Sequence, residues 1–276
     1  MAIATATVNG NTFMLGRNKS IAYGPRLRLA KYLNTVEMPA PPESVSYTAA
    51  ATKSLHNVYL NNKLGDCVIA MIWHIYGVLT ANAGNEIVAT DAQIVKDYSN
   101  IGGYNGNPRT DNGCDMQTAN NWVLTKGYAG TTNKIEGWLS VDPKNLTECR
   151  AAVNLFEHLG LAAGVPNAWL NVPGEGFTWD RGGANGNNGH AFMIAGYNGG
   201  GFEVSTWGLL GTLTNSAMTH NIEEAYVYLD DAMIDKAKGR APNGLDWYNL
   251  VKDFNDMGGN LPLPTPAPSV VLDLFV

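Results

Sequence analysis

The 276-residue sequence has few charged residues, few cysteines and no long apolar run. Only 15% of the residues are charged, so Asn, Gly, Ser and Thr must supply much of the polar surface. The hydrophobic content of 45% is enough for a globular core. Acidic residues outnumber basic ones by 24 to 18, and the net charge is −6 with no basic cluster. Nucleic acid is therefore not an expected partner.

The three cysteines are an odd number without framework spacing, which excludes a disulfide-stapled fold and leaves a free thiol. The first residues lack a basic region and a following apolar region, so we expect no signal peptide. The longest apolar run, near residues 68–81, is too short to cross a bilayer, so we expect no membrane association.

The most informative stretch runs from Asn61 to His74. A polar, glycine-containing turn leads into Asp66, and the residues from Val68 to Leu79 then carry neither proline nor charge. With Asp66 as the N-cap, this pattern predicts a buried helix that begins at Cys67. The helix dipole and the unpaired N–H groups of a first turn favour a thiolate. Cys67 is therefore a candidate nucleophile, although a buried free cysteine is often only structural.

A cysteine nucleophile needs a base. Of the five histidines, His190 follows a glycine-rich loop and opens a predicted strand, so it can face a cleft. His74 lies two turns after Cys67 on the same predicted helix and is expected to be a core residue.

The predicted helices precede most of the predicted strands. We expect helices at 67–83, 94–98, 115–126 and 145–159, strands at 161–165, 190–197, 202–207 and 225–229, and extended chain at 45–61. This segregation predicts an α+β fold with two lobes rather than alternating α/β. Residues 1–44 are expected to be an arm or linker, and residues 45–229 the main domain, with a helical lobe at about 62–150 and a β lobe at about 151–229. Residues 230–276 are expected to be a C-terminal extension.

Taken together, these landmarks resemble the papain-like cysteine proteases over roughly residues 41–229. Four sequence motifs of that family have counterparts in this chain. In chain order they are the block that ends in the nucleophilic Cys, the Gly-Cys-Asn turn, the catalytic His followed by a Gly-Tyr pair, and the Ser-Trp-Gly motif. These counterparts are Asn61 to Cys67, Gly113-Cys114-Asp115, His190-Ala191 with Gly196-Tyr197, and Thr206-Trp207-Gly208. Each piece alone is weak, but their order is specific.

The resemblance implies a papain-like two-lobed fold and peptide-bond cleavage through an acyl-enzyme, without cofactor or metal. Cys67 would be the nucleophile and His190 its proton partner. Ser205 stands at the position of the family's orienting Asn, with Trp207 as its shield. Asn61 stands at the position of the oxyanion-hole Gln, with Asn62 as the alternative. We expect four residues beside the substrate: Gly65, Asp66, Trp207 and Gly189.

Some features leave alternatives open. The charge of Asp66 would raise the thiol pKa unless the side chain only caps the helix. The serine in place of Asn leaves open a retained but inactive scaffold, such as a binding subunit of a larger assembly. The Gly182–Gly189 loop lacks the Lys-Ser/Thr ending of a phosphate-binding loop, so we expect a flexible loop beside the cleft. The Asp111–Asp115 segment lacks the ligand spacing of an EF-hand, so we expect a turn rather than a calcium site.

The family usually has a long inhibitory propeptide, whereas about 40 residues precede the resemblance here. The arm either shields the cleft in a smaller way, or the protein needs no latency. The missing signal peptide and family disulfide favour a cytoplasmic or virion-associated protein of bacterial or phage origin. Residues 1–44 and 230–276 are candidate contacts in a homo- or hetero-oligomer.

Overall fold

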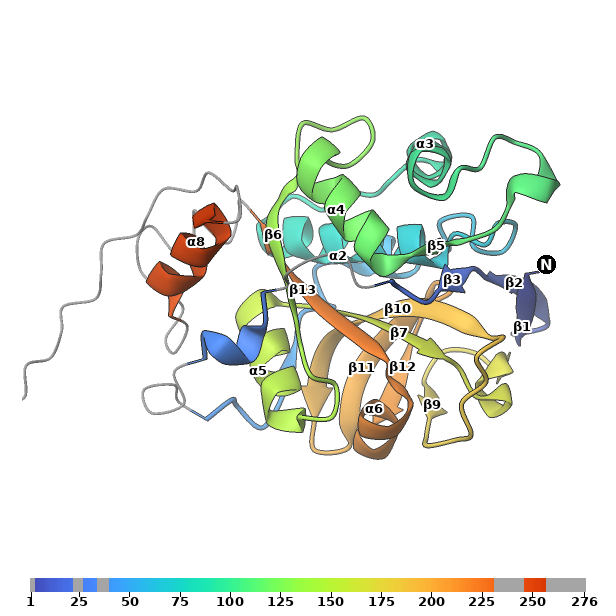
Figure 1. The fold of residues 1–276 in the computed structure, drawn as a ribbon. Coiled ribbons are helices and arrows are strands. Elements are labelled where there is room, and N and C mark those ends of the chain that lie inside the picture. Colours follow the sequence, from blue (N-terminus) through green and yellow to red (C-terminus); the bar gives the residue numbers. More distant parts are fainter. Residues whose placement is uncertain (1–2, 22–26, 34–39, 231–245, 257–276) are drawn as a thin grey trace, which may run out of the picture.

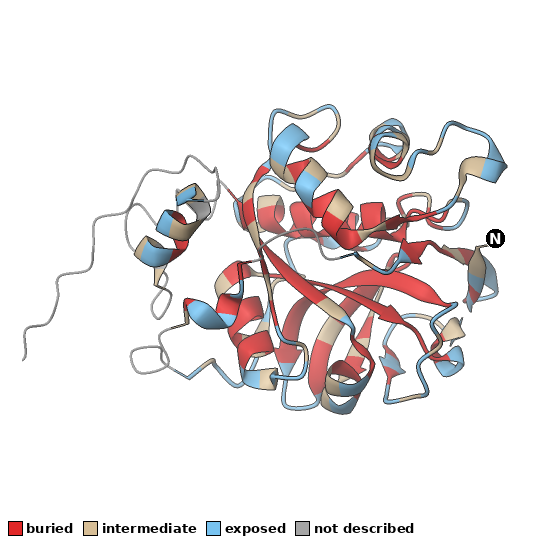
Figure 2. Ribbon diagram, in the orientation of Figure 1, coloured by how far each residue is buried: buried red, intermediate tan, exposed pale blue. Residues whose placement is uncertain are grey.

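The protein has an α+β fold with two lobes, as predicted (Figure 1). A computed structural model describes residues 3–21, 27–33, 40–230 and 246–256. In Figure 1 three helices form the upper part of the molecule: α2 (Cys67–Asn82), α3 (Asp91–Gly102) and α4 (Met116–Lys126). A twisted sheet forms the lower part, together with α5 (Leu146–Phe156) and α6 (Asn215–Asn221). Buried residues are concentrated in α2 and the central strands (Figure 2).

The helical lobe is built around α2 (Cys67–Asn82), which confirms the predicted helix. Almost every side chain of α2 is buried, because the helix is apolar on all faces. The other helices of this lobe are α1 (Thr52–Leu55), α3 (Asp91–Gly102), η2 (Pro108–Thr110) and α4 (Met116–Lys126). A capping box between Thr90 and Gln93 starts α3. Residues 45–61, predicted to be extended, contain a helix because α1 forms after the short strand β4 (Val45–Ser46).

The β lobe contains a sheet of order β6-β13-β7-β10-β11-β12-β9, with β4 also paired to β10. Its strands are β6 (Ile135–Ser140), β7 (Leu159–Gly164), β9 (Phe177–Trp179), β10 (Gly189–Asn198), β11 (Gly201–Thr206), β12 (Leu209–Thr214) and β13 (Glu224–Asp230). The sheet begins before the lobe boundary expected at residue 150, because β6 pairs with β13. Helices α5 (Leu146–Phe156) and α6 (Asn215–Asn221) complete the lobe.

Strand β10 separates two hydrophobic cores. Ala191 and Met193 belong to the core around α2, whereas Phe192 and Ile194 belong to the core of the β lobe. This division follows from the two-residue period of a strand, which sends neighbouring side chains to opposite faces. His190, near the start of β10, is therefore held at the junction of the lobes.

The N-terminal arm is folded onto both lobes. Strands β1 (Ala4–Val8) and β2 (Asn11–Leu15) form a hairpin, and β1 also pairs with β8 (Asn171–Val172), next to η3 (Asn167–Leu170). The turn residues Asn9 and Gly10 both have positive φ, as a two-residue hairpin requires. The Asn-Gly dipeptide was thus an available signal for this hairpin. Strand β3 (Arg17–Asn18) then pairs with β5 (Cys114–Asp115) and passes between the lobes (Figure 1).

The described part of the C-terminal extension is α8 (Trp247–Asp256). Its Leu250 and Val251 are buried, and its Asp253 accepts hydrogen bonds from Lys31 and Tyr32 beside η1 (Leu29–Lys31). The proline-rich stretch at 261–268 lies outside the described residues. Among the helices that are described, none has the length and apolar character that crossing a membrane requires.

Candidate active site

Cys67 and His190 come from different lobes and line one small cavity. Cys67 is the first residue of α2, which packs against β10 near His190. Both side chains are about 1% exposed. The free space between the lining residues is about 10 Å³, on the order of one water molecule. The structure therefore brings together the predicted nucleophile and its predicted proton partner, but leaves no space for a peptide.

The ring of His190 is fixed by two neighbours. Its Nε2 lies 2.8 Å from the Thr206 hydroxyl, and its ring stacks on Trp207 with centroids 4.5 Å apart. Its Nδ1 is buried and has no hydrogen-bond partner among the described residues. When Nε2–H donates to Thr206, the Nδ1 lone pair is left to accept a proton. Trp207, predicted to shield the contact of this histidine, stacks on the imidazole ring itself.

The hydroxyl that holds His190 is not the predicted one. Sequence comparison placed this role on Ser205, but the bond is made by Thr206, and no described residue bonds the buried Ser205 Oγ. The pairing of β10 with β11 shifts by one residue between Ile194 and Gly196, which is a β-bulge. Bulges re-aim side chains in this way. Thr206 is thus the functional candidate that the sequence reasoning missed.

Asn61 and Asp66 form a buried pair beneath the cavity. The Asn61 amide donates to Asp66 at 3.2 Å and to the carbonyls of Leu64 and Met14, each at 3.1 Å. Asp66 occupies the N-cap position, but its carboxyl makes no capping bond, which corrects that expectation. Burial raises the pKa of Asp66 well above its usual value, although the hydrogen bond from Asn61 opposes the change. The structure shows Asp66 holding Asn61 rather than facing a substrate.

Burial keeps both reacting groups neutral in this state. It raises the pKa of the Cys67 thiol to about 11, although hydrogen bonding to the backbone of Ala191 and Gly16 opposes the change. Burial also lowers the pKa of His190 to about 3. His74, predicted to be a core residue, is buried, and its Nε2 lies 2.9 Å from the Asn57 carbonyl. The site as it stands is a thiol beside a neutral imidazole.

The N-terminal arm fills the cleft between the lobes. A methyl group on Gly16 would lie 1.7 Å from the carbonyl oxygen of Gly65, and one on Gly113 would lie 1.8 Å from the carbonyl oxygen of Gly16. On the opposite wall, a methyl group on Gly189 would lie 1.9 Å from the carbonyl oxygen of Arg17. Three glycines from distant parts of the chain therefore permit the arm to pass. Gly65 and Gly189, predicted to lie beside a substrate, here lie beside the arm.

The arm is also bonded to the site. The Met14 N–H donates to the Asn61 carbonyl at 2.9 Å, and the Asn61 amide returns a bond to the Met14 carbonyl. The Cys114 N–H donates to the Gly16 carbonyl at 3.0 Å. The next side chain, that of Arg17, is buried between Glu223 and Glu224.

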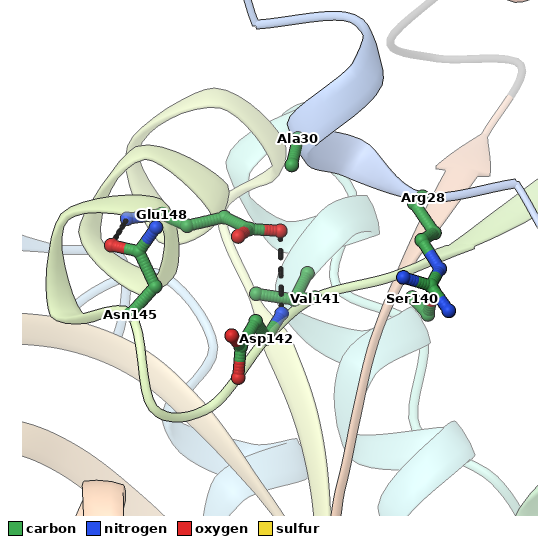
Figure 3. Close-up of a pocket in the computed structure, with 7 residues that line it drawn as sticks. All are labelled: Arg28, Ala30, Ser140, Val141, Asp142, Asn145 and Glu148. Carbon is green, nitrogen blue, oxygen red and sulfur yellow. Dashed lines mark hydrogen bonds between the residues drawn. The ribbon is translucent and has the colours of Figure 1, made fainter.

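A larger pocket of about 620 Å³ lies elsewhere (Figure 3). Arg28 and Ala30 of the arm line it, together with Ser140, Val141, Asp142, Asn145 and Glu148. In Figure 3 the Glu148 carboxylate accepts a hydrogen bond from the Asp142 N–H, so this carboxylate already bonds to the pocket wall. This pocket contains no cysteine or histidine. No group of three potential metal ligands occurs in the part of the chain that the structure describes.

The fold is that of papain-like cysteine proteases. The chain superimposes on xylellain, a cysteine protease from Xylella fastidiosa, with a TM-score of 0.62 and 13% identity, over 83% of this chain and 99% of that one. It is also similar to procathepsin B S9 from Trypanosoma congolense, with a TM-score of 0.55 and 9% identity, over 78% and 86% of the two chains. No family model and no curated protein sequence matches the chain.

Proposed function

We propose that this protein is a cysteine peptidase that its own N-terminal arm keeps latent. The observation that carries the proposal is the shared cavity of Cys67 and His190, two side chains 123 positions apart in sequence on opposite lobes of a papain-like fold. The fold alone does not establish activity, because one fold can host several functions. The free Nδ1 of His190 and the bond from Nε2 to Thr206 supply the additional chemical argument.

In the proposed reaction, the arm first leaves the cleft and a peptide replaces it. The Cys67 sulfur attacks the peptide carbonyl carbon while its proton resides on His190 Nδ1. His190 then gives that proton to the departing amine, and a thioester remains. Water, deprotonated by the same imidazole, attacks the thioester carbonyl and releases the acid and the thiol. Throughout the cycle Thr206 holds the ring in one orientation.

Asn61 is the proposed donor to the oxyanion. Its amide currently bonds the Met14 carbonyl, and departure of the arm frees that N–H for a substrate oxygen. Loss of one such donor lowers the rate by roughly 10²–10³-fold in enzymes of this chemistry. We therefore expect Asn61→Ala to reduce kcat by that order in a chain whose arm has been displaced.

Gly16→Ala in the full-length chain tests the proposed function. The added methyl group would overlap the Gly65 carbonyl, so one of the two backbones must shift, and we expect the arm to leave the cleft. We expect this variant to react with an epoxide thiol inhibitor at Cys67 and to cleave a peptide library, whereas Gly16→Ala with Cys67→Ala does neither. Gly199→Ala is the matched control, because nothing lies within 4 Å of its added methyl group.

Two results would contradict the proposal in different ways. Labelling of Cys67 without any cleavage across the library would favour the inactive scaffold. Unselective labelling of Cys67, Cys114 and Cys149 would show that Gly16→Ala had unfolded the chain, and circular dichroism distinguishes this case. Gly16→Ser, which also places a Cβ against Gly65, provides a second displacement variant.

A further inference from the structure

The pocket of about 620 Å³ in Figure 3 has no part in the proposed reaction, yet it has the size of a ligand site. Pockets that bind small molecules usually measure about 300–1,000 Å³. Two segments build its walls. Arg28 and Ala30 come from the arm at η1, and the other lining residues come from the end of β6 and the start of α5. Its lining is mostly polar, so a ligand here is recognised by charge and hydrogen bonds.

Backbone contacts hold the two segments together. The Ser140 N–H donates to the Leu27 carbonyl at 2.9 Å, and the Ser140 hydroxyl donates to the same carbonyl at 3.2 Å. Arg28 also forms a parallel β-bridge with Ser140. Leu27 and Leu29 on either side of Arg28 are buried in the β-lobe core. The pocket walls are therefore fixed by the fold.

The pocket carries charges of both signs on separate walls. In Figure 3 the Arg28 guanidinium lies beside Ser140, and the Glu148 carboxylate lies apart from it, next to Ala30. Among the residues that the structure places, neither these two groups nor Asp142 forms an ion pair. A cation and two carboxylates thus line one space without neutralising one another.

The Glu148 carboxylate is the most buried of the three charged groups. Its residue is 4% exposed, and it accepts hydrogen bonds from the N–H groups of Asp142, at 3.3 Å, and Ala30. Burial raises the pKa of Glu148, and these two bonds oppose the change only in part. A carboxylate has about four acceptor sites, so two N–H bonds leave room for a further donor. A cationic donor would also offset the effect of burial.

The spacing of the opposite charges matches the two ends of a dipeptide. Arg28 lies beside Ser140, and the Glu148 carboxylate lies at the N–H of Asp142, which is two residues further along the chain. Two residues of extended chain span at most about 7 Å. An extended dipeptide has the same length between its terminal ammonium and its terminal carboxylate, whereas a single amino acid has about half of it.

We propose that this pocket binds a short zwitterionic peptide of about two residues. Arg28 binds its terminal carboxylate, and Glu148 and Asp142 bind its terminal ammonium. The side chains of Ser140 and Asn145 face the peptide group between the two ends. This inference goes beyond the proposed peptidase function and does not rest on it.

Isothermal titration calorimetry of the full-length chain with alanylalanine tests the proposal. We expect saturable binding of this dipeptide. N-acetyl-alanylalanine lacks the ammonium and alanylalanine amide lacks the carboxylate, so each should bind at least about tenfold more weakly, because hydrogen bonds between charged groups are the strong ones. No saturable binding of alanylalanine, or equal binding of the three compounds, would overturn the proposal.

Substitutions assign each charge to one end of the dipeptide. Arg28→Met should weaken binding of alanylalanine at least about tenfold and change that of its amide by less than about twofold. Asp142→Asn with Glu148→Gln should likewise weaken alanylalanine and spare the N-acetyl compound. The exposed Arg109 on η2 and Asp91 on α3 provide matched controls, and Arg109→Met and Asp91→Asn should preserve all three affinities. A preference for alanylalanine over its amide that survives Arg28→Met would overturn the proposal.

Discussion

The pairing of His190 with Thr206 depends on a single extra residue in β10. Asn198 pairs with Gly201 at the hairpin turn, and continuing that register would put Ser205 on the same face as His190. The bulge between Ile194 and Gly196 shifts the register, so Met193 pairs with Ser205 and the next residue, Thr206, faces His190. Sequence comparison therefore finds the right strand and misses the right hydroxyl by one position.

Substitution of the two hydroxyls distinguishes their roles. Thr206→Val keeps the shape but removes the acceptor for Nε2–H, so the imidazole loses its fixed orientation. In the Gly16→Ala background we expect a fall in kcat/KM of roughly 10²-fold, the lower part of the contribution usual for general acid–base catalysis. Ser205→Ala should change kcat/KM by less than about threefold, since no described residue bonds the Ser205 hydroxyl. Equal losses in the two variants would contradict the assignment.

At the scale of elements, α8 is attached in two ways, by buried apolar side chains and by an ion pair to the arm, and the two attachments differ in strength. Leu250 is 0% exposed within the β-lobe core, whereas the Lys31 side chain of the bridge to Asp253 is 64% exposed. Exposed ion pairs contribute about 0–1 kcal/mol, because water and salt screen them. The apolar contacts are therefore the stronger attachment.

Two substitutions test this difference. We expect Leu250→Ala to lower the free energy of unfolding by about 2–5 kcal/mol, as for other buried leucines. Lys31→Met should change it by less than about 1 kcal/mol, because it removes only the exposed half of the pair. Urea denaturation of both full-length variants measures the difference. A larger loss for Lys31→Met would show that the ion pair holds the helix.

Elements with strong local signals could be predicted from the sequence. The continuous apolar run and the glycine stops predicted α2 and α4, and the alternating strands around Asn198–Gly201 predicted β10 and β11. The helix α5 was also predicted, but it ends at Phe156, and Gly160, its expected stop, lies inside β7. The two-residue strands β3 and β5 have no periodicity to detect, and their pairing joins positions almost 100 residues apart. Their placement depends on Gly16, Gly65 and Gly113 meeting in space, which no local pattern reports.

At the scale of the whole molecule, the arm joins the two lobes. The arm bonds the helical lobe through Asn61 and Cys114, and the β lobe through Glu223 and Glu224. The described part of residues 1–44 thus packs on its own chain. The predicted contacts of the two terminal segments with neighbouring subunits remain a prediction. A segment bonded to both lobes also excludes water from the thiol and imidazole, and this couples closure to pH.

The sign of that coupling follows from three pKa shifts. In the closed state burial lowers the pKa of His190 to about 3, and Glu224 is also lowered, by Ser20 and Arg17 against the effect of burial. The open state therefore binds more protons below about pH 6.5, and closure weakens as the pH falls from there. The Cys67 pKa is raised by burial to about 11 from 9.0, so the closed state binds more protons between these values. Closure therefore also weakens as the pH rises above 9.

Other buried groups near the thiol belong to the helical lobe. Asp66 bonds Asn61, and His74 bonds the Asn57 carbonyl. We therefore expect the arm to be held most firmly between about pH 6.5 and 9. Each unit of pKa shift corresponds to about 1.4 kcal/mol, so acid provides the larger opening force.

The rate at which a disulfide reagent modifies Cys67 measures this dependence, with peptide mass spectrometry separating it from Cys114 and Cys149. Dividing each rate by that of the urea-unfolded chain at the same pH removes the intrinsic reactivity of the thiol. We expect protection of Cys67 to be greatest between pH 6.5 and 9 and to fall on both sides, while Gly16→Ala shows little protection at any pH. Protection that strengthens as the pH falls from 6.5 to 4 would contradict arm docking as the cause, because a neutral imidazole at the interface requires the opposite sign.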